Sequence, residues 1–169
     1  MGEDRGVSLN VRRRPTVPYL AGLRLSGRRV VVLGAGGVVE RRLPLLLHTG
    51  AAITVISPAA RPVVVEAAGR GELRWERRIY QPGDLTGAWY VLAATNDPVA
   101  NAAASQEAEA AQIFCVRADD ATASSAWTPA TAEVDGITIG VLAGRDPRRA
   151  VAVRELLVEA LRRIARRAA

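Results

Sequence analysis

The sequence predicts an α/β fold with a doubly wound parallel sheet, followed by a small region of extended and helical segments. Three observations support this prediction. Through residues 19–124, short segments rich in β-branched residues alternate with segments of helical spacing, which is the pattern of parallel strands joined by helices. The first such strand, at 30–33, runs directly into a glycine cluster. After Asp120 the alternation stops, and two extended segments precede a long amphipathic helix.

On this basis we divide the 169 residues into three parts. Residues 1–18 are polar, rich in arginine and interrupted by Pro15 and Pro18, so we expect a flexible tail. Residues 19–124 are expected to form a Rossmann-like dinucleotide-binding domain. Residues 125–169 are expected to form a dimerisation or substrate region.

The glycine cluster after the first strand predicts a nucleotide site. In a strand–turn–helix unit of this kind, Gly34 permits the tight turn, and Gly36 lets the backbone approach a pyrophosphate at the helix N-terminus. Val39 stands where the dinucleotide fingerprint has a third Gly or Ala. The flanking strand and helix therefore support the prediction as much as the glycines do. The alternative, a glycine loop that binds nothing, stays open.

The segment after the second strand bears on the choice of coenzyme. The first helix is expected to end at Gly50, and the second strand, at 53–56, leads into Ser57. An NAD site usually has an acidic residue about 20 positions past the glycines, where it binds the ribose hydroxyls. None is present here, and Ser57 offers one weaker hydrogen bond. No arginine directly follows the strand to bind a 2′-phosphate, so the sequence favours NAD over NADP.

Further elements complete the alternating pattern. We expect strands and helices, in chain order, at 62–70 (helix), 72–76 (strand), 89–94 (strand), 98–111 (helix) and 113–116 (strand). Asp97 is a suitable N-cap and Pro98 a suitable first residue for the second of these helices.

The C-terminal part has a different character. Residues 126–129 and 137–141 are expected to be extended and joined by a turn at Asp135-Gly136. A last helix is expected to begin at Asp146-Pro147. It carries an apolar stripe made of Ala150, Val153, Leu157, Ala160 and Ile164. Such a stripe suits packing between two subunits, and it equally suits packing against the chain's own sheet.

The charge composition points to an anionic partner. The net charge is +6, and all 23 basic residues are arginine, a side chain that binds carboxylates and phosphates in a bidentate manner. Aromatic residues make up 4% of the chain and do not alternate with basic ones, as they do where unpaired bases are stacked. The charge by itself leaves both a polyanionic small molecule and a nucleic acid open as partners.

Several classes of protein are disfavoured by the rest of the composition. No apolar run approaches the ~18 residues of a membrane span, so no membrane association is expected. A single cysteine, Cys115, fits a reducing compartment and a cytoplasmic location. No cluster of Cys and His has the spacing of metal ligands, so the sequence offers no preformed metal site.

Five segments, taken in order, resemble the siroheme synthase amino-terminal domain, or precorrin-2 dehydrogenase and sirohydrochlorin ferrochelatase, over roughly residues 19–163. They are 34–42, 93–97 with Asn101, 114–120, 127–129 and 144–147. The resemblance implies a homodimer that uses NAD⁺ to oxidise precorrin-2 to sirohydrochlorin in siroheme biosynthesis. Some members then insert Fe²⁺, and whether this chain does so is left open.

The resemblance also implies roles for individual residues. Gly37 and Val38 would border the pyrophosphate, Pro58 and Ala59 the adenosine, and Thr95 and Asn96 belong to the same cofactor site. Asp119 matches the family's essential aspartate. The tetrapyrrole substrate carries eight carboxylates, which gives the arginine-rich composition a use that needs no nucleic acid.

The chain departs from the family pattern at two places. Val116 stands where the family usually has Asn, and 141–144 replaces a longer Ser/Gly-rich loop. Relatives continue beyond the last helix. We therefore expect either a shortened form of this region or a chain cut from a longer enzyme that adds a methyltransferase.

Three residues carry alternative interpretations. We expect Asp119 to be the catalytic residue, with its pKa raised by partial burial or by Asp120, although a loop acid or helix cap is the alternative. Cys115 is expected to be a small core residue. The only histidine, His48, lies near a helix C-terminus, where a structural role is favoured over metal binding.

Two other function classes compete with the dehydrogenase. One is a non-enzymatic, dimeric dinucleotide-sensing module, which would bind the coenzyme and leave precorrin-2 unchanged. The other is a nucleic-acid binder, suggested by charge alone, whose affinity for arbitrary DNA would fall steeply with salt.

Overall fold

The computed structural model describes residues 17–144 and 146–168, so all but the last two residues of the expected tail at 1–18 lie outside the described residues. Five parallel strands form the main sheet, in the order β3-β2-β1-β4-β5. They are β1 (Arg29–Leu33), β2 (Ala52–Ile56), β3 (Arg74–Glu76), β4 (Tyr90–Ala93) and β5 (Phe114–Arg117). The doubly wound parallel sheet predicted from the sequence is thereby confirmed.

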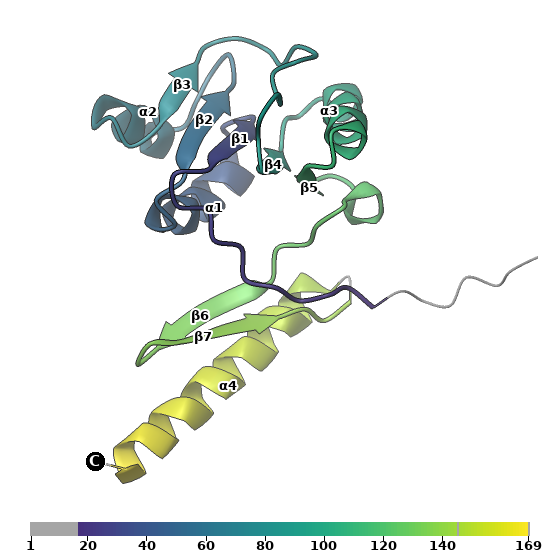
Figure 1. Ribbon diagram of the computed structural model, residues 1–169. Coiled ribbons are helices and arrows are strands. Elements are labelled where there is room, and N and C mark those ends of the chain that lie inside the picture. Colours follow the sequence, from purple (N-terminus) through teal and green to yellow (C-terminus); the bar gives the residue numbers. More distant parts are fainter. Residues whose placement is uncertain (1–16, 145, 169) are drawn as a thin grey trace, which may run out of the picture.

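Helices cover both faces of this sheet (Figure 1). One face packs against α1 (Gly37–His48) and α2 (Pro62–Gly69) through side chains such as Val39 and Val64. The other face packs against α3 (Pro98–Ala110) through Ala104 and Ala108. Alternate residues of β1 serve the two cores, because successive side chains of a strand point to opposite faces. The strand is therefore buried on both sides, as its continuous apolar sequence predicts.

The outer edge of the sheet at β5 is closed by the chain that follows it, which includes a short 3₁₀ helix at Ala121–Ala123. The Ser125 hydroxyl accepts a hydrogen bond from the Cys115 N–H (2.9 Å), and the Ala126 N–H donates to the Cys115 carbonyl (3.1 Å). Unpaired backbone groups at the edge of a sheet can pair with another chain and cause aggregation. These two contacts give the N–H and the carbonyl of Cys115 partners within the chain. Residues 126–129, which the sequence predicts to be extended, precede the strand that pairs with 137–141, because that strand begins at Ala130.

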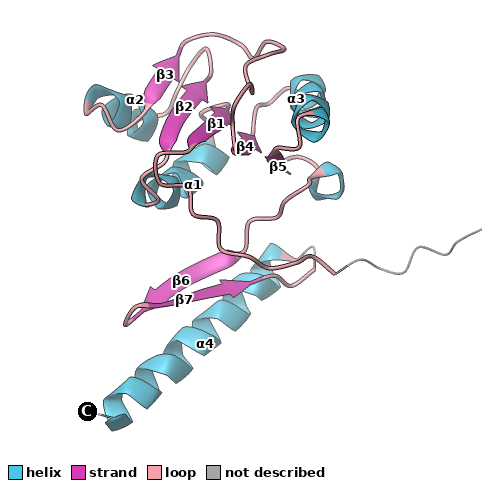
Figure 2. Cartoon of the chain, in the orientation of Figure 1, coloured by secondary structure: helices cyan, strands magenta, loops and turns pink. Residues whose placement is uncertain are grey.

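A two-stranded hairpin and a long helix form the second part of the molecule (Figure 2). The hairpin pairs β6 (Ala130–Val134) with β7 (Ile137–Val141) in antiparallel register. Its turn at Asp135-Gly136 was predicted correctly. Both residues have positive φ (50° and 77°), as a tight hairpin turn that matches the strand twist requires.

The last helix, α4 (Pro147–Ala168), lies along the hairpin (Figure 1). Asp146 caps it, accepting a hydrogen bond from the Arg149 N–H (2.9 Å). Ala150 and Val158 are buried. The other large side chains of the expected stripe, Val153, Leu157 and Ile164, remain exposed. The helix thus covers its own hairpin with one side and presents a second apolar side that nothing in this chain covers among the described residues.

No helix in the described part of the chain combines the length and apolar character needed to cross a membrane.

Candidate functional site

The turn between β1 and α1 requires glycine at its first position. Gly34 has φ +88°, and a Cβ placed there would lie 2.4 Å from the Ala94 carbonyl oxygen, on the neighbouring strand's exit. Gly36 differs, because no atom lies within 4 Å of a Cβ added there. The chain therefore packs tightly at Gly34 and leaves open space at Gly36, as the sequence predicts for a turn that admits a ligand to the helix N-terminus.

The N-terminus of α1 presents unused hydrogen-bond donors beside this space. Gly36 is the N-cap, it has no side chain to cap the helix, and the first helical bond runs from the Glu40 N–H to the Gly36 carbonyl (3.0 Å). The backbone N–H groups of Gly37 and Val38 therefore have no partner within the helix, and the helix dipole favours an anion there. Pyrophosphate is the anion that this geometry suits.

A cavity of about 730 Å³ opens at the carboxyl ends of β1, β2 and β4. Most of the cofactor residues expected from the sequence line it, namely Gly34, Gly36, Ser57, Pro58, Ala59, Thr95 and Asn96. Gly37 and Val38 are not among the lining residues, and they border the site only through the helix terminus. The strand order changes direction between β1 and β4, and ligands of doubly wound sheets bind at this switch point.

The residues that follow β2 agree only in part with the sequence prediction for the adenosine end of the site. The Ser57 hydroxyl donates a hydrogen bond to the Ala59 carbonyl (2.7 Å), so its proton is already used and it can only accept from a ribose. Arg61, which the sequence analysis did not select, lines the same cavity. Its guanidinium forms an ion pair with Glu40 of α1 (3.1 Å). The cavity thus contains an arginine near the expected adenosine site, and a carboxylate neutralises it.

The exit of β4 is held by a buried asparagine. Asn101 is 1% exposed, and its amide accepts from the Thr95 N–H (3.1 Å) and donates to the Thr95 carbonyl (3.1 Å). Asp97 caps α3 by accepting from the Val99 N–H (2.8 Å), which confirms the predicted cap. These bonds fix the loop that carries Thr95 and Asn96 into the cavity.

Asp119 lies two residues beyond the end of β5, and it lines neither the cavity at the glycine turn nor the second cavity described below. Its carboxylate forms a two-point ion pair with Arg117 (3.2 and 2.7 Å). That ion pair, with smaller contributions from its own backbone and from Asn101, lowers the pKa of Asp119. The expectation of a raised pKa is therefore wrong, because partial burial is outweighed by the guanidinium. Ala93 pairs with Arg117 across the sheet, so Asp119 follows the strand next to the one that leads to Thr95.

Asp120 does not share a proton with Asp119. Its side chain accepts from the Thr122 hydroxyl (2.7 Å) and the Thr122 N–H (2.9 Å), and these bonds lower its pKa. Cys115 is buried, and burial raises the pKa of its thiol to about 11, which is the behaviour of an inert core residue. His48 Nδ1 donates to the Pro44 carbonyl (2.7 Å), a local contact at the end of α1.

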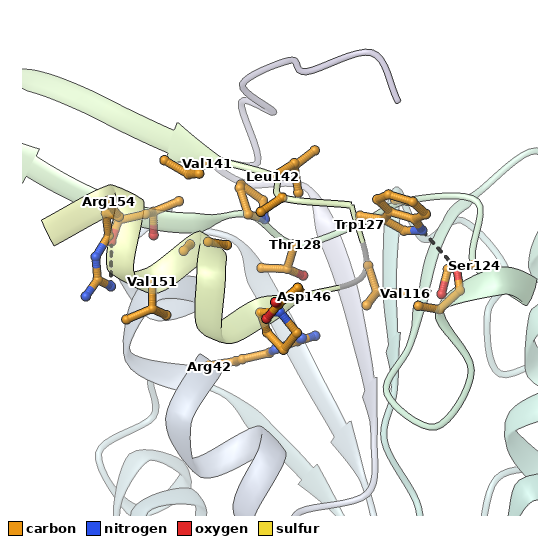
Figure 3. A pocket seen from close by; sticks show the side chains of 18 of the residues that line it. Arg42, Val116, Ser124, Trp127, Thr128, Val141, Leu142, Asp146, Val151 and Arg154 are labelled. Atoms are coloured by element: carbon orange, nitrogen blue, oxygen red, sulfur yellow. Dashed lines mark hydrogen bonds between the residues drawn. The ribbon is translucent and has the colours of Figure 1, made fainter. Parts of the chain in front are cut away.

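A second cavity, of about 610 Å³, lies between α1, the end of β5 and the hairpin–helix part (Figure 3). Of the arginines that the structure describes, four line it, from α1 (Arg41, Arg42), β5 (Arg117) and α4 (Arg154). Asp146 is the one carboxylate among its lining residues. These residues are far apart in the chain, so the arginines expected to bind substrate could not be identified from the sequence.

Three further residues line the first cavity and were not predicted from the sequence. Ile79, Tyr80 and Pro82, from the loop between β3 and β4, close one side of it. Nothing in that loop's pattern indicates a ligand contact. Across the residues that the structure describes, no group of three or more His, Cys, Asp or Glu side chains is placed to hold a metal ion.

Known proteins resemble this chain in sequence and in structure. A family model described as "Putative NAD(P)-binding" matches residues 21–130. "Siroheme synthase 3" of Aeromonas hydrophila is 37% identical over 121 residues, which are 72% of this chain and 26% of that protein. "Precorrin-2 dehydrogenase" of Bacillus subtilis is 29% identical over 120 residues, covering 70% of this chain and 73% of that protein.

A solved structure, "SirC, precorrin-2 dehydrogenase", superposes with a TM-score of 0.74 at 27% identity and covers 85% of this chain and 71% of that one. The chain spans about a quarter of the length of the siroheme synthases from the two Aeromonas species that it matches. The cavity at the glycine turn lies within the residues matched by the family model. The chain therefore belongs to the "Putative NAD(P)-binding" family, and its homologues include siroheme synthases and precorrin-2 dehydrogenases.

Proposed function

We propose that this protein is an NAD-dependent dehydrogenase that oxidises precorrin-2 to sirohydrochlorin. The observation that carries the proposal is the cavity at the switch point of the sheet, where the glycine turn and the Asn101-anchored loop meet. The open space at Gly36 and the unused N–H groups of α1 fit a dinucleotide pyrophosphate. The names of the homologous proteins supply the substrate.

The reaction removes a hydride and a proton from the macrocycle. When bound, the nicotinamide accepts the hydride. Asp119 is our candidate for the proton acceptor, because it follows the strand adjacent to the one that leads to Thr95. At neutral pH its lowered pKa keeps it ionised and able to accept a proton, although the pair with Arg117 also makes it a weak base. Arg117 lines the second cavity, so a substrate carboxylate there can compete with Asp119 for the guanidinium.

NAD rather than NADP is the coenzyme we propose. A 2′-phosphate needs an unneutralised cation at the adenosine end of the site. Arg61 is the arginine that lines this cavity in the described residues, and Glu40 already pairs with it.

We further propose that two copies associate through the uncovered side of α4. Val153, Leu157 and Ile164 are exposed on a helix whose other side packs on its own hairpin. A contiguous exposed apolar surface of this kind is typical of an interface. Fe²⁺ is proposed only as a second substrate, with the macrocycle supplying the ligands.

An absorbance time course of precorrin-2 with NAD⁺, and then with Fe²⁺, tests the proposal. Formation of sirohydrochlorin that requires NAD⁺ is the expected result, and a further spectral change with Fe²⁺ would indicate chelation. Binding of NAD⁺ with precorrin-2 left unchanged would reject the enzyme and favour the non-enzymatic sensing module. Asp119→Ala should keep NAD⁺ affinity and lose at least ~100-fold in oxidation, whereas Asp120→Ala should lose much less.

A further inference from the structure

The side chain of Arg42 has a buried nitrogen without a hydrogen-bond partner. Its Nη1 has no exposed surface and no hydrogen-bond partner, and it is the only buried side-chain nitrogen or oxygen without a partner among the described residues. The residue as a whole is half-buried, so the rest of the guanidinium remains accessible from the cavity that it lines. Buried polar atoms are nearly always paired, and a guanidinium with an unpaired buried nitrogen is unfavourable. A guanidinium of this kind can bind an anionic group.

Among the residues that the structure describes, none forms an ion pair with Arg42. Arg42 comes from α1 and lines the second cavity, as Asp146 does (Figure 3). Asp146 caps α4 instead, and no ion pair joins it to Arg42. The nearby Tyr90 hydroxyl faces the Thr128 hydroxyl (3.2 Å), and burial raises the pKa of Tyr90, so it stays neutral.

The other described arginines of this cavity are either paired with a carboxylate or exposed to solvent. Arg117 is paired with Asp119, and Arg154 is paired with Glu155 and donates to the Thr131 carbonyl (3.4 Å). Arg41 is exposed and can be satisfied by water. Arg42 therefore combines a half-buried guanidinium, which forms no ion pair with any other described residue, with a cavity of about 610 Å³ that it lines. Such a guanidinium suits a carboxylate, which it can bind in a bidentate manner.

We propose that Arg42 anchors a carboxylate of the tetrapyrrole substrate in the cavity between α1 and the hairpin–helix part. The proposal rests on the proposed function, and it names the side chain that fixes the orientation of the macrocycle. A peripheral carboxylate held by Arg42 places the ring on the side of Asp119, because Arg117 and Ala118 line the same cavity and Asp119 follows them. Arg42 is thus a positioning residue for the hydride transfer.

Arg42→Met tests this assignment because methionine fills similar space without charge or donors. Uroporphyrin, a stable macrocycle with eight carboxylates, is the probe, and calorimetry measures its affinity. The variant should bind uroporphyrin at least about tenfold more weakly and keep the parent's NAD⁺ affinity. Its midpoint of thermal unfolding should be equal to or above that of the parent, because the unpaired buried nitrogen is gone. A purely structural arginine would instead lower the midpoint.

Two further variants complete the experiment. Arg42→Lys keeps the charge without the planar fork and should lie between the parent and Arg42→Met in affinity. Arg70→Met removes one charge from an exposed residue after α2, outside both cavities, and should leave uroporphyrin affinity unchanged. In turnover with precorrin-2, Arg42→Met should raise KM by more than it lowers kcat.

The outcomes separate this proposal from the proposed function. If the parent oxidises precorrin-2 and Arg42→Met binds uroporphyrin as the parent does, the role of Arg42 is rejected and the dehydrogenase stands. If the parent binds uroporphyrin through Arg42 and does not oxidise precorrin-2, the carboxylate site stands and the dehydrogenase is rejected. A lower unfolding midpoint in both Arg42 variants, with affinity for uroporphyrin retained, would assign the residue a structural role.

Discussion

Arg117 determines the protonation of Asp119, and with it the pH dependence of any chemistry at this carboxylate. Their two-point ion pair lowers the pKa of Asp119 in the folded protein. The stabilising contribution of the ionised carboxylate is therefore present above the pKa of an unfolded aspartate, about 3.9, and is lost as pH falls through the lower folded value. Neutral pH lies well above this window.

A pH profile follows from this ion pair. If Asp119 is the proton acceptor, kcat/KM should show no loss from its titration between pH 8 and pH 5, because this parameter reports pKa values of the free enzyme. Arg117→Met should move the acid limb of the profile to higher pH, since the main cause of the lowered pKa is removed. An acid limb near pH 6 in the parent that Arg117→Met leaves in place would show that another group is the base.

The two turn glycines should respond differently to substitution. Gly34→Ala places a Cβ 2.4 Å from the Ala94 carbonyl oxygen at φ +88°, so it should destabilise the fold by roughly 2 kcal/mol or more in urea unfolding. Gly36→Asp enters open space at the N-cap of α1, where Asp is a favourable residue, and should leave the fold at least as stable. Calorimetry should nevertheless show loss of NAD⁺ binding, because the new carboxylate repels the pyrophosphate. Retained NAD⁺ affinity would contradict the assigned cofactor site.

Glu40 is expected to control coenzyme choice through Arg61. Their ion pair is partly exposed, with side-chain exposures of 39% and 55%, so it contributes little stability. Glu40→Gln should free the guanidinium and strengthen NADP⁺ binding relative to NAD⁺, by up to about tenfold for one new charge-assisted contact. The ratio of the two dissociation constants measures this effect, and Glu66→Gln on α2 is a charge-matched control. An unchanged ratio would place Arg61 away from the 2′-position.

At the scale of elements, the helix α4 has two apolar sides, one buried and one exposed. Ala150 and Val158 pack against the hairpin, whereas Val153 and Leu157 face outward with 37% and 43% of their surface exposed. The sequence pattern grouped Ala150 with the exposed residues, because a spacing of three and four cannot distinguish two adjacent stripes on the same helix.

Polar substitutions on the two sides of α4 should therefore have different effects. Val153→Ser with Leu157→Ser should convert dimers to monomers in sedimentation, since each buried aliphatic side chain is worth ~1.5–3 kcal/mol at an interface, and should change monomer stability little. Val158→Ser should instead destabilise the packing of α4 on the hairpin. A parent that sediments as a monomer at high micromolar concentration would reject the proposed dimer.

At the scale of the whole molecule, the sheet part and the hairpin–helix part meet at the second cavity, and the dinucleotide cavity lies in the sheet part alone. Coenzyme binding should therefore stabilise the sheet part directly. NAD⁺ at about 100 times its dissociation constant should add about 2.7 kcal/mol to the free energy of unfolding. Thermal unfolding with and without NAD⁺ measures this, and the Gly36→Asp variant, which should show no such shift, is the control.

The sequence alone determined those features of the fold that depend on a few neighbouring residues. The apolar run of β1, the glycine at 34, the Asp97 cap and the Asp135-Gly136 turn are fixed by side-chain size, backbone freedom and short-range hydrogen bonds, all of which can be recognised in a few consecutive residues. The order of these elements predicted the doubly wound sheet, and the sheet in turn predicted the edge at which Gly36, Ser57 and Thr95 meet.

Only the tertiary structure decided how the charges are paired. Arg61 pairs with Glu40, Arg117 pairs with Asp119, and Arg42 is half-buried with one nitrogen unpaired. Nothing in the local sequence distinguishes these arginines from the other arginines of the chain. Burial and ion pairing depend on which elements pack together, and here residues from α1, β5 and α4 converge on one cavity. That packing decides the pKa of a carboxylate and whether a buried donor finds a partner. The sequence could therefore identify Asp119 as the candidate base, but it could not predict the direction in which its pKa is shifted.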